Sequence, residues 1–335
     1  KLMSEIDKPW QNKLFIGHQP IIGQLDRLKK TNSINNTLLF SGPIGVGKCT
    51  LAFRYSNYIF SDIVSSFMDY EQFNNNTFSQ ISNHSYTNLH YICNPDDNGN
   101  SLEIKIEDIR KLKDNLNGKL LNGGHRVIII DTINDLNRSA QNALLKILEE
   151  PPNNTLFILI THNISSVPDT ILSRCLKFNF KNLSISDTKQ VIAGVNDEIR
   201  LKKIIDIYGM NISPGKIIHL MNNNFEEIIQ DFNDLIKSKN TNEKDVLKTI
   251  KFYSKKENLS SFNILFELFM IWLKKNAISF LADLREDYKL YEILGYWDKY
   301  SDKYNSLNIF NLSREEFLLN IHRDVWRLSN RKIDG

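Results

Sequence analysis

Cysteine, net charge and long apolar runs are all scarce in this sequence. Three of its 335 residues are cysteines, and Cys49, Cys93 and Cys175 lie far apart without forming a CxxC pair. This usage favours a reduced, cytoplasmic protein. The formal net charge is only +3, which is too small by itself to indicate a protein that binds nucleic acid through a strongly basic surface.

No stretch of the sequence predicts a membrane segment. The most apolar run of the second half, Phe262 to Leu273, is broken by Asn263 and Glu267 and followed by Lys274-Lys275. We interpret it as a buried helix of a bundle rather than a membrane span. Lys1 to Trp10 carry charge from the start, so no signal peptide is expected, and we expect no membrane partner.

What the sequence does contain is a set of short apolar runs followed by a long helical region. Thr37–Phe40, Val127–Asp131 and Leu156–Ile160 are too short for most helices and predict buried parallel strands. From about Phe225 to Gly335 the pattern is helical throughout. A chain of 335 residues with 41% hydrophobic and 24% charged residues is typical of a soluble globular protein of two or three domains.

A phosphate-binding loop follows the first predicted strand. The segment from Ser41 to Thr50 reads SGPIGVGKCT, and its glycines are Gly42, Gly45 and Gly47. Glycines allow backbone N–H groups to approach phosphate oxygens, while the helix that begins near Lys48 directs its positive end at them. Lys48 would reach the terminal phosphates. The strand, loop and helix therefore predict a nucleotide-binding P-loop.

Position 49 departs from the P-loop pattern. A Ser or Thr hydroxyl normally binds Mg²⁺ there, but the sequence has Cys49, whose thiol is a soft and poor ligand for that hard ion. Thr50 is one position too far around the helix to replace the missing hydroxyl. We therefore expect a nucleotide site with impaired magnesium binding and no other metal site.

Two further strings carry a resemblance to a known family. Ala140 to Pro152 reads AQNALLKILEEPP, with apolar residues at helical spacing, and Leu172 to Cys175 reads LSRC. With the P-loop, these strings closely resemble the clamp-loader branch of the AAA+ ATPases. The best match is to the delta-prime subunits of bacterial DNA polymerase III, and the gamma/tau subunits come second. The resemblance covers roughly residues 14–218.

The resemblance implies a three-part architecture. Residues 1–180 would form an α/β AAA+ P-loop core with a parallel sheet, and residues 181–225 a small helical lid. Residues 226–335 would form an all-α collar domain through which clamp-loader subunits assemble into a ring. For this last region the sequence alone supports only a helical bundle.

The resemblance also indicates an incomplete ATPase site. Asp131 occupies the place of the acid associated with the metal, but Thr132 stands where hydrolysing members carry a glutamate that activates water. Asp135 lies four residues later and does not simply replace it. Loss of a general base typically removes about 10²–10⁴-fold of rate. We therefore expect no ATP turnover and no required cofactor, while binding of ATP or ADP without hydrolysis stays open.

Three more positions correspond to nucleotide contacts of the family. Asn163 is the candidate polar sensor, although polar residues capping the end of a strand would look the same. Lys216 lies where active relatives carry an arginine, and lysine keeps the charge without the planar fork. Ile16-Gly17-His18 is similar to a segment that lies over adenine, and an ordinary turn before a helix is the alternative.

Arg174 is the residue to which the resemblance assigns a catalytic role. It would be an arginine finger, acting in trans in the nucleotide site of an adjacent subunit. Such a cation stabilises transition-state charge and is worth about 10³–10⁵ in rate in known cases. A solvated surface arginine is the alternative.

Between Phe60 and Glu103 the sequence is polar, rich in asparagine and weakly periodic. Many relatives carry a four-cysteine zinc module after the P-loop helix, and only Cys93 falls in this segment. His84, His90 and Cys93 are loosely spaced and have no fourth ligand. We expect a surface loop here, without zinc.

These observations lead to one preferred function and two rivals. The preferred function is a non-hydrolysing, delta-prime-like subunit of a clamp loader that helps to place the sliding clamp on primed DNA during replication. Its partners would be the gamma/tau and delta subunits, with the clamp and primed DNA reached through the assembly. An active gamma/tau-like ATPase would require Ser or Thr at 49 and an acid at 132. A P-loop enzyme such as a nucleotide kinase is disfavoured by the Arg174 segment and the C-terminal helices.

Overall fold

The structure is a computed structural model that describes residues 8–13, 15–31, 37–61, 76–94, 103–116, 118, 124–193, 197–236, 243–281, 287–309 and 312–330. The chain divides into two compact units. The first takes the described residues of Lys1–Asp96, Ser101–Glu198 and Met210–Ile218, and the second takes those of Asp97–Asn100, Ile199–Gly209 and His219–Gly335. The finer division at residues 180 and 225 stays a prediction.

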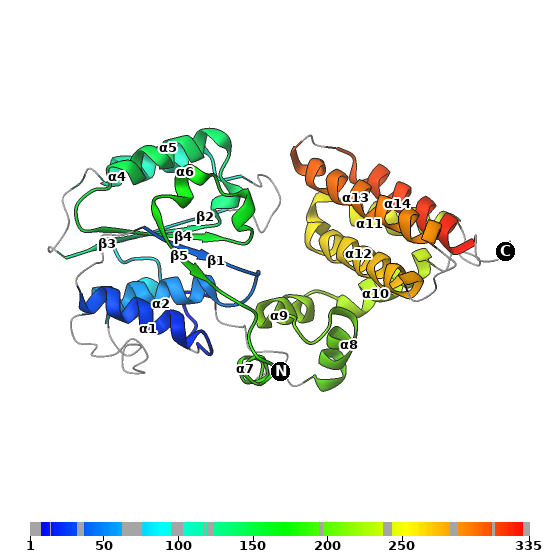
Figure 1. The fold of residues 1–335 in the computed structure, drawn as a ribbon, viewed down its shortest axis with the longest axis horizontal. Helices are drawn as coiled ribbons and strands as arrows, with labels where there is room; N and C mark the ends of the chain where they lie inside the picture. The colour runs from blue at the N-terminus through cyan, green and yellow to red at the C-terminus, as the bar shows by residue number, and fades with distance from the viewer. Residues whose placement is uncertain are drawn as a thin grey trace. The chain divides into compact units, whose positions relative to one another are not determined.

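A five-stranded parallel sheet forms the centre of the first unit (Figure 1). The strand order is β2-β3-β4-β1-β5. The strands are β1 (Thr37–Ser41), β2 (Leu89–Cys93), β3 (Arg126–Asp131), β4 (Thr155–Thr161) and β5 (Cys175–Asn179). The three strands predicted from apolar runs are therefore confirmed as β1, β3 and β4. Because all strands are parallel, the carboxyl ends of β1, β3 and β4 lie at one edge of the sheet.

Helices cover both faces of this sheet, as Figure 1 shows. On one face lie α1 (Gln19–Lys30) and α2 (Lys48–Phe60), and on the other lie α4 (Ile106–Leu116), α5 (Arg138–Glu149) and α6 (Asp169–Leu172). Each face has its own apolar core, because strand residues alternate between them: Phe40 and Ile158 pack with α1 and α2, whereas Leu39 and Phe157 pack with α4 and α5. Short elements complete the unit: α3 (Asn76–Ser82), α7 (Ile185–Val191), η2 (Ile133–Asp135) and η3 (Ile164–Ser166).

Helix α5 begins and packs as its sequence predicts. The Asn137 side chain accepts a hydrogen bond of 2.8 Å from the backbone N–H of Ala140, which caps the helix. Its apolar stripe is buried against the sheet through Ala140, Leu144, Ile147 and Leu148. The string that carried the family resemblance is thus a helix whose remaining face carries polar residues.

The expectation of a surface loop between residues 60 and 103 is wrong for part of that segment. Residues 62–75 and 95–102 lie outside the described residues, but Asn76–Ser82 form α3 and Leu89–Cys93 form β2. Strand β2 pairs with β3 at the border of the sheet and is half-buried along its length. A half-buried edge strand need not read as a continuous apolar run, as the fully buried strands do, which is why its polar composition concealed it.

The second unit is helical throughout its described residues. Its helices are α8 (Glu198–Tyr208), the end of α9 (Pro214–Asn222), α10 (Phe225–Ile236), α11 (Glu243–Ser254), η4 (Lys256–Asn258), α12 (Leu259–Leu281), α13 (Asp287–Ile309) and α14 (Arg314–Asn330). Aromatic rings fill its core; Phe266 and Tyr304, for example, stack with centroids 4.1 Å apart. Among the described helices, none combines the length and apolarity that crossing a membrane requires.

Candidate functional site

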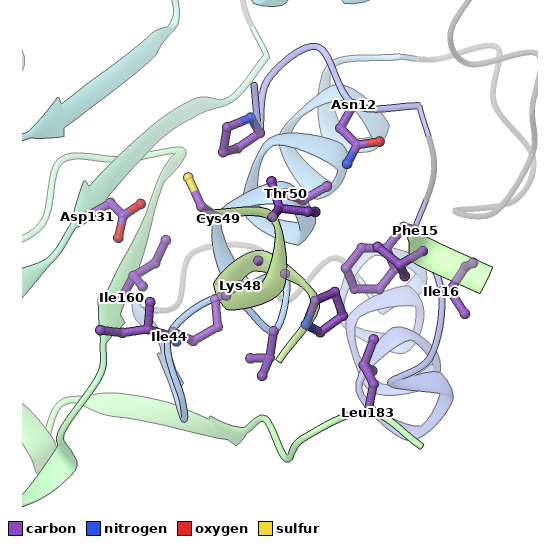
Figure 2. A pocket seen from close by; sticks show the side chains of 18 of the residues that line it. Asn12, Phe15, Ile16, Ile44, Lys48, Cys49, Thr50, Asp131, Ile160 and Leu183 are labelled. Atoms are coloured by element: carbon purple, nitrogen blue, oxygen red, sulfur yellow. The ribbon is translucent and has the colours of Figure 1, made fainter. Parts of the chain in front are cut away.

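A cavity of about 350 Å³ lies at the carboxyl edge of the sheet, in the first unit (Figure 2). The structure brings six predicted site residues to its wall: Gly45, Gly47, Lys48, Cys49, Thr50 and Asp131. The first five follow β1 and open α2, while Asp131 ends β3. Parallel topology explains this meeting, because ligands in open α/β sheets bind outside the carboxyl ends of the strands.

The loop between β1 and α2 has a backbone that glycine alone adopts without strain. Gly45 and Gly47 have φ values of 78° and 96°, in the left-handed region. Gly42 has a φ of 142°, and a Cβ there would lie 2.2 Å from the Phe180 carbonyl oxygen. The P-loop glycines are therefore required by backbone geometry, although Gly42 itself does not reach the cavity wall.

The Lys48 ammonium is bound by the loop that carries it. Its Nζ donates hydrogen bonds to the backbone carbonyls of Gly42 and Pro43, at 2.7 and 2.6 Å. Burial lowers the pKa of Lys48 to about 8, although the negative charge of Asp131 opposes that shift. The charge expected to meet a terminal phosphate is thus partly satisfied inside the protein.

Cys49 and Asp131, the two groups at the predicted magnesium position, interact with each other. The Cys49 thiol and the Asp131 carboxylate are close enough to influence each other's pKa, and the Tyr91 hydroxyl lies 3.8 Å from the sulfur. Burial, reinforced by the nearby carboxylate, raises the pKa of Cys49 well above its ordinary value. The sulfur therefore stays protonated at neutral pH. Sulfur is a soft and poor ligand for a hard ion such as Mg²⁺, so Cys49 does not fit the position of a magnesium ligand.

The first turn of α9 lies directly on the P-loop, a contact that the sequence did not predict. The Gly215 amide donates to the Gly45 carbonyl at 2.9 Å, and the Ser213 hydroxyl donates to the Ile44 carbonyl at 2.6 Å. A Cβ on Gly215 would lie 2.6 Å from the Gly45 Cα. Only a residue without a side chain fits this close approach, and position 215 is a glycine.

The wall of the cavity away from Asp131 is largely apolar. It is lined by Phe15, Ile16, Leu183, Val191 and Ile218, and Figure 2 shows the first three on the side opposite Asp131. An aromatic and aliphatic wall suits a planar, weakly polar ligand group such as a nucleobase.

The Ile16-Gly17-His18 segment takes part in this wall. Ile16 lines the cavity, Gly17 packs closely against Leu183, and His18 Nε2 lies 3.0 Å from the Val46 carbonyl of the P-loop. The interpretation of this segment as a nucleobase contact stays a prediction.

At the end of β4 the structure brings His162, and not Asn163, to the cavity wall. The Asn163 side chain accepts a hydrogen bond of 3.1 Å from the Ser165 N–H and so caps η3. Burial, with the positive charge of Lys48, lowers the pKa of His162 to about 4, so its imidazole is neutral at neutral pH. The sensor role of Asn163 stays a prediction that its capping geometry does not favour.

Other predicted residues lie outside the cavity wall. Thr132 is buried behind Asp131, and Lys216 follows the α9 turn, with its amide bonded to the Ser213 hydroxyl at 3.3 Å. Asp135 belongs to η2, where burial raises the pKa of its carboxyl group to about 6.

Arg174 lies on the surface between α6 and β5, away from the cavity. Its Nη2 forms an ion pair of 2.9 Å with Glu149 Oε1 at the end of α5, and its Nη1 donates to the Thr170 carbonyl at 2.7 Å. The Arg174 side chain is 35% exposed. Arg174 is not among the residues that line the cavity, and the finger role stays a prediction.

The described histidines and cysteines do not assemble a metal site. His90 and Cys93 belong to β2, and His84 packs in a ring cluster, 4.6 Å from the centroid of Trp10. Across the described ranges, no group of three or more His, Cys, Asp or Glu residues is arranged to hold a metal ion.

A parallel sheet with a glycine-rich loop after β1 and an acid at the end of β3 defines a P-loop α/β domain, here followed by a mostly helical part. This confirms the predicted fold class. A family model described as "DNA polymerase III, delta subunit" matches residues 17–184. The chain belongs to this family.

Relatives with known names agree with that assignment. The chain is 31% identical over 203 residues to DNA polymerase III subunit tau/gamma of Haemophilus influenzae, covering 56% of this chain and 27% of the relative. It is 30% identical over 200 residues to DNA polymerase III subunit gamma of Buchnera aphidicola, covering 56% and 50%. The chain thus spans between about a quarter and a half of the length of these relatives.

A gamma subunit-related protein from Thermotoga maritima is similar in structure. It covers 91% of this chain and 99% of its own, with 16% identity and a TM-score of 0.40. That likeness is too weak to support any inference.

Proposed function

We propose that this chain is a delta-prime-like, non-hydrolysing subunit of the clamp loader of a bacterial DNA polymerase III. In a cytoplasmic replication assembly that also contains a delta subunit, it would stand beside a gamma/tau ATPase and would offer Arg174 to the nucleotide bound by that neighbour. The assembly would place a sliding clamp on primed DNA. The chemistry would be ATP hydrolysis on another chain.

One observation carries the non-hydrolysing part of this proposal. Cys49 and Asp131 line the same cavity wall, so the position that should offer Mg²⁺ a hydroxyl beside this carboxylate offers a thiol instead. Thr132 offers a hydroxyl where a general base is needed, and the Asp135 carboxylate lies outside the cavity wall. Family membership and the P-loop fold are compatible with both active and inactive subunits. The composition of this site is what favours the inactive one.

The second part of the proposal concerns the ligand of the cavity. Its apolar wall suits a nucleobase, and its P-loop glycines and Lys48 suit phosphate. We propose that the cavity binds ADP or ATP without hydrolysing it. No cofactor and no zinc ion is required for the role in the assembly. Equilibrium dialysis of labelled ADP and ATP, with and without Mg²⁺, tests this: magnesium should not increase the affinity for either nucleotide.

The decisive experiment measures ATP hydrolysis by the purified chain, by a gamma/tau partner, and by the two together with clamp and primed DNA. The chain alone should show no turnover, and the complex should hydrolyse faster than the partner alone. Arg174→Ala should remove that stimulation. Arg110→Ala, which changes another exposed arginine of the same unit, is the matched control and should preserve it.

The rival function, an active gamma/tau-like ATPase, is supported by the identity to gamma and tau subunits. The same experiment separates the two. Turnover by the isolated chain would establish the active subunit, and stimulation that survives Arg174→Ala would remove the arginine-finger role.

A further inference from the structure

The two strings that carry the family resemblance meet in one contact. Glu149 is the last residue of α5, and Arg174 follows α6 in the LSRC string. Glu149 Oε1 and Arg174 Nη2 are 2.9 Å apart. The residues are 25 positions apart in the sequence, so the fold is required to join them.

Arg174 is held at both of its terminal nitrogens. Nη2 donates to Glu149, while Nη1 donates to the Thr170 carbonyl at 2.7 Å and more weakly to the Ser173 hydroxyl at 3.5 Å. The backbone is fixed as well, because the Arg174 amide donates to the Ile171 carbonyl at 3.0 Å. These contacts restrict both the position and the plane of the guanidinium.

The same contacts leave donors for a further ligand. A guanidinium carries five N–H groups in a rigid fork, and the contacts of Arg174 within the described residues use three of them. At least two N–H groups are left for phosphate oxygens, which is the number that bidentate recognition needs. An anchored guanidinium loses less conformational freedom when it binds than a freely rotating one.

We propose that Glu149 is a positioning residue for Arg174: it holds the guanidinium in the orientation in which an adjacent, triphosphate-binding subunit receives it. This inference rests on the proposed function and adds a second residue to it. An exposed ion pair is weak, so Glu149 is expected to change the rate only by a small factor, through the orientation of Arg174. Arg174 itself supplies the charge. Loss of Glu149 should lower the rate about two- to fivefold, against about 10³–10⁵-fold for loss of an arginine finger.

The test uses the reconstituted complex with its ATPase partner, clamp and primed DNA, and measures kcat and KM for ATP. Glu149→Ala should lower kcat about two- to fivefold with KM changed less than twofold, since the ground state of the nucleotide is bound by another chain. Glu149→Gln keeps an oxygen acceptor for Nη2 and should retain most of the rate. Glu150→Ala removes the neighbouring exposed carboxylate and should change nothing.

A double variant separates positioning from general damage to the fold. In an Arg174→Ala background, Glu149→Ala should have no further effect, because the residue through which it acts is gone. Equal rates for the Glu149→Ala and Glu150→Ala complexes would overturn the positioning role while leaving the finger intact. An Arg174→Ala complex with full activity would refute the arginine-finger role in the proposed function. The positioning role of Glu149 would then be refuted as well.

Discussion

The backbone amide of Gly215 donates a hydrogen bond of 2.9 Å to the carbonyl of Gly45, so the crest of the P-loop is in direct contact with the first turn of α9. A Cβ on Gly215 would lie 2.6 Å from the Gly45 Cα, with two more Gly45 backbone atoms within 3.2 Å. The atoms that a Cβ on Gly215 would meet are backbone atoms, which cannot move aside as a flexible side chain can.

Gly215→Ala is therefore expected to lower the free energy of unfolding of the chain by about 1–3 kcal/mol, as overpacking of a tight contact does. Urea unfolding of the full chain measures it. Gly23→Ala is the matched control, because a Cβ at Gly23 in α1 would meet nothing within 4 Å. It should be neutral or stabilise by about 0.4–1 kcal/mol. If both variants behave alike, the contact between α9 and the P-loop does not persist in solution.

The half-buried thiols of Cys49 and Cys175 should react slowly with alkylating agents. Burial raises the pKa of Cys175 to about 11 from an ordinary 9.0, and raises that of Cys49 well above it. At pH 8 the thiolate fraction of Cys175 should then be about 100-fold below that of a free cysteine, and the rate should rise about tenfold per pH unit up to pH 10. Iodoacetamide labelling followed by peptide mass spectrometry, with N-acetylcysteine as reference, measures both rates. Alkylation of Cys49 as fast as the reference would contradict its burial against Asp131.

The Asp135 carboxyl group should make stability depend on pH between about 4 and 6. Burial and the charge of Asp131 raise its pKa from 3.8 to about 6, so in this window the folded state binds more protons than the unfolded state. The free energy of unfolding must fall as pH rises through this range. Above pH 6 the full destabilisation from the ionised Asp135 carboxylate is present.

Asp135→Asn should remove this cost and raise the free energy of unfolding at pH 7.5 by on the order of 1–2 kcal/mol, discounted for partial exposure. The two proteins should converge near pH 3.5, where both states are protonated. Urea unfolding at both pH values tests it, with Glu150→Gln as an exposed control. A variant that is less stable than the parent at pH 7.5 would show that the ionised form of Asp135 is favoured by its surroundings.

In the second unit, a buried tyrosine–aspartate pair should contribute measurably to stability. The Tyr300 hydroxyl donates to Asp324 Oδ2 at 2.6 Å, and Lys299 Nζ binds the same oxygen at 2.5 Å. Tyr300 is fully buried and Asp324 is 6% exposed. Tyr300→Phe should cost about 2 kcal/mol, because it removes a hydrogen bond to a charged and buried acceptor.

Tyr291→Phe provides the comparison for that variant. Tyr291 lies on α13, as Tyr300 does, but is 75% exposed, so the same loss of a hydroxyl should change stability by less than about 0.5 kcal/mol. Thermal or urea unfolding distinguishes the two variants. Equal stabilities would mean that the interaction between Tyr300 and Asp324 is no stronger than hydration of the hydroxyl.

The sequence predicted those parts of the fold whose signal is local. Strands β1, β3 and β4 are buried on both faces and read as continuous apolar runs, whereas β2, at the border of the sheet, is interrupted by His90 and was taken for loop. The helix cap at Asn137 is also local, because it joins residues three positions apart.

The contacts within the site could not be predicted, because they join distant segments. Cys49 and Asp131 were both named, but their meeting at one cavity wall depends on the spacing of strands across the sheet. Gly215 was not named, because its approach to Gly45 depends on how a distant segment returns to the P-loop. The sequence identified residues whose chemistry does not suit ATP hydrolysis, while the fold determined which of them lie together.

The short segment after β3 has a consequence for how much this region tolerates substitution. The Asn134 side chain uses all four of its hydrogen-bonding positions on the segment after β4: Oδ1 accepts from the Thr161 hydroxyl at 2.7 Å and the His162 amide at 3.1 Å, and Nδ2 donates to the Asn163 carbonyl at 3.3 Å and the Ser166 hydroxyl at 2.5 Å. An aspartate would lose both donated bonds, and an apolar residue of equal size would lose all four. Asn134 thus links the ends of β3 and β4 through four hydrogen bonds. Only a primary carboxamide on a side chain of this length can make all four.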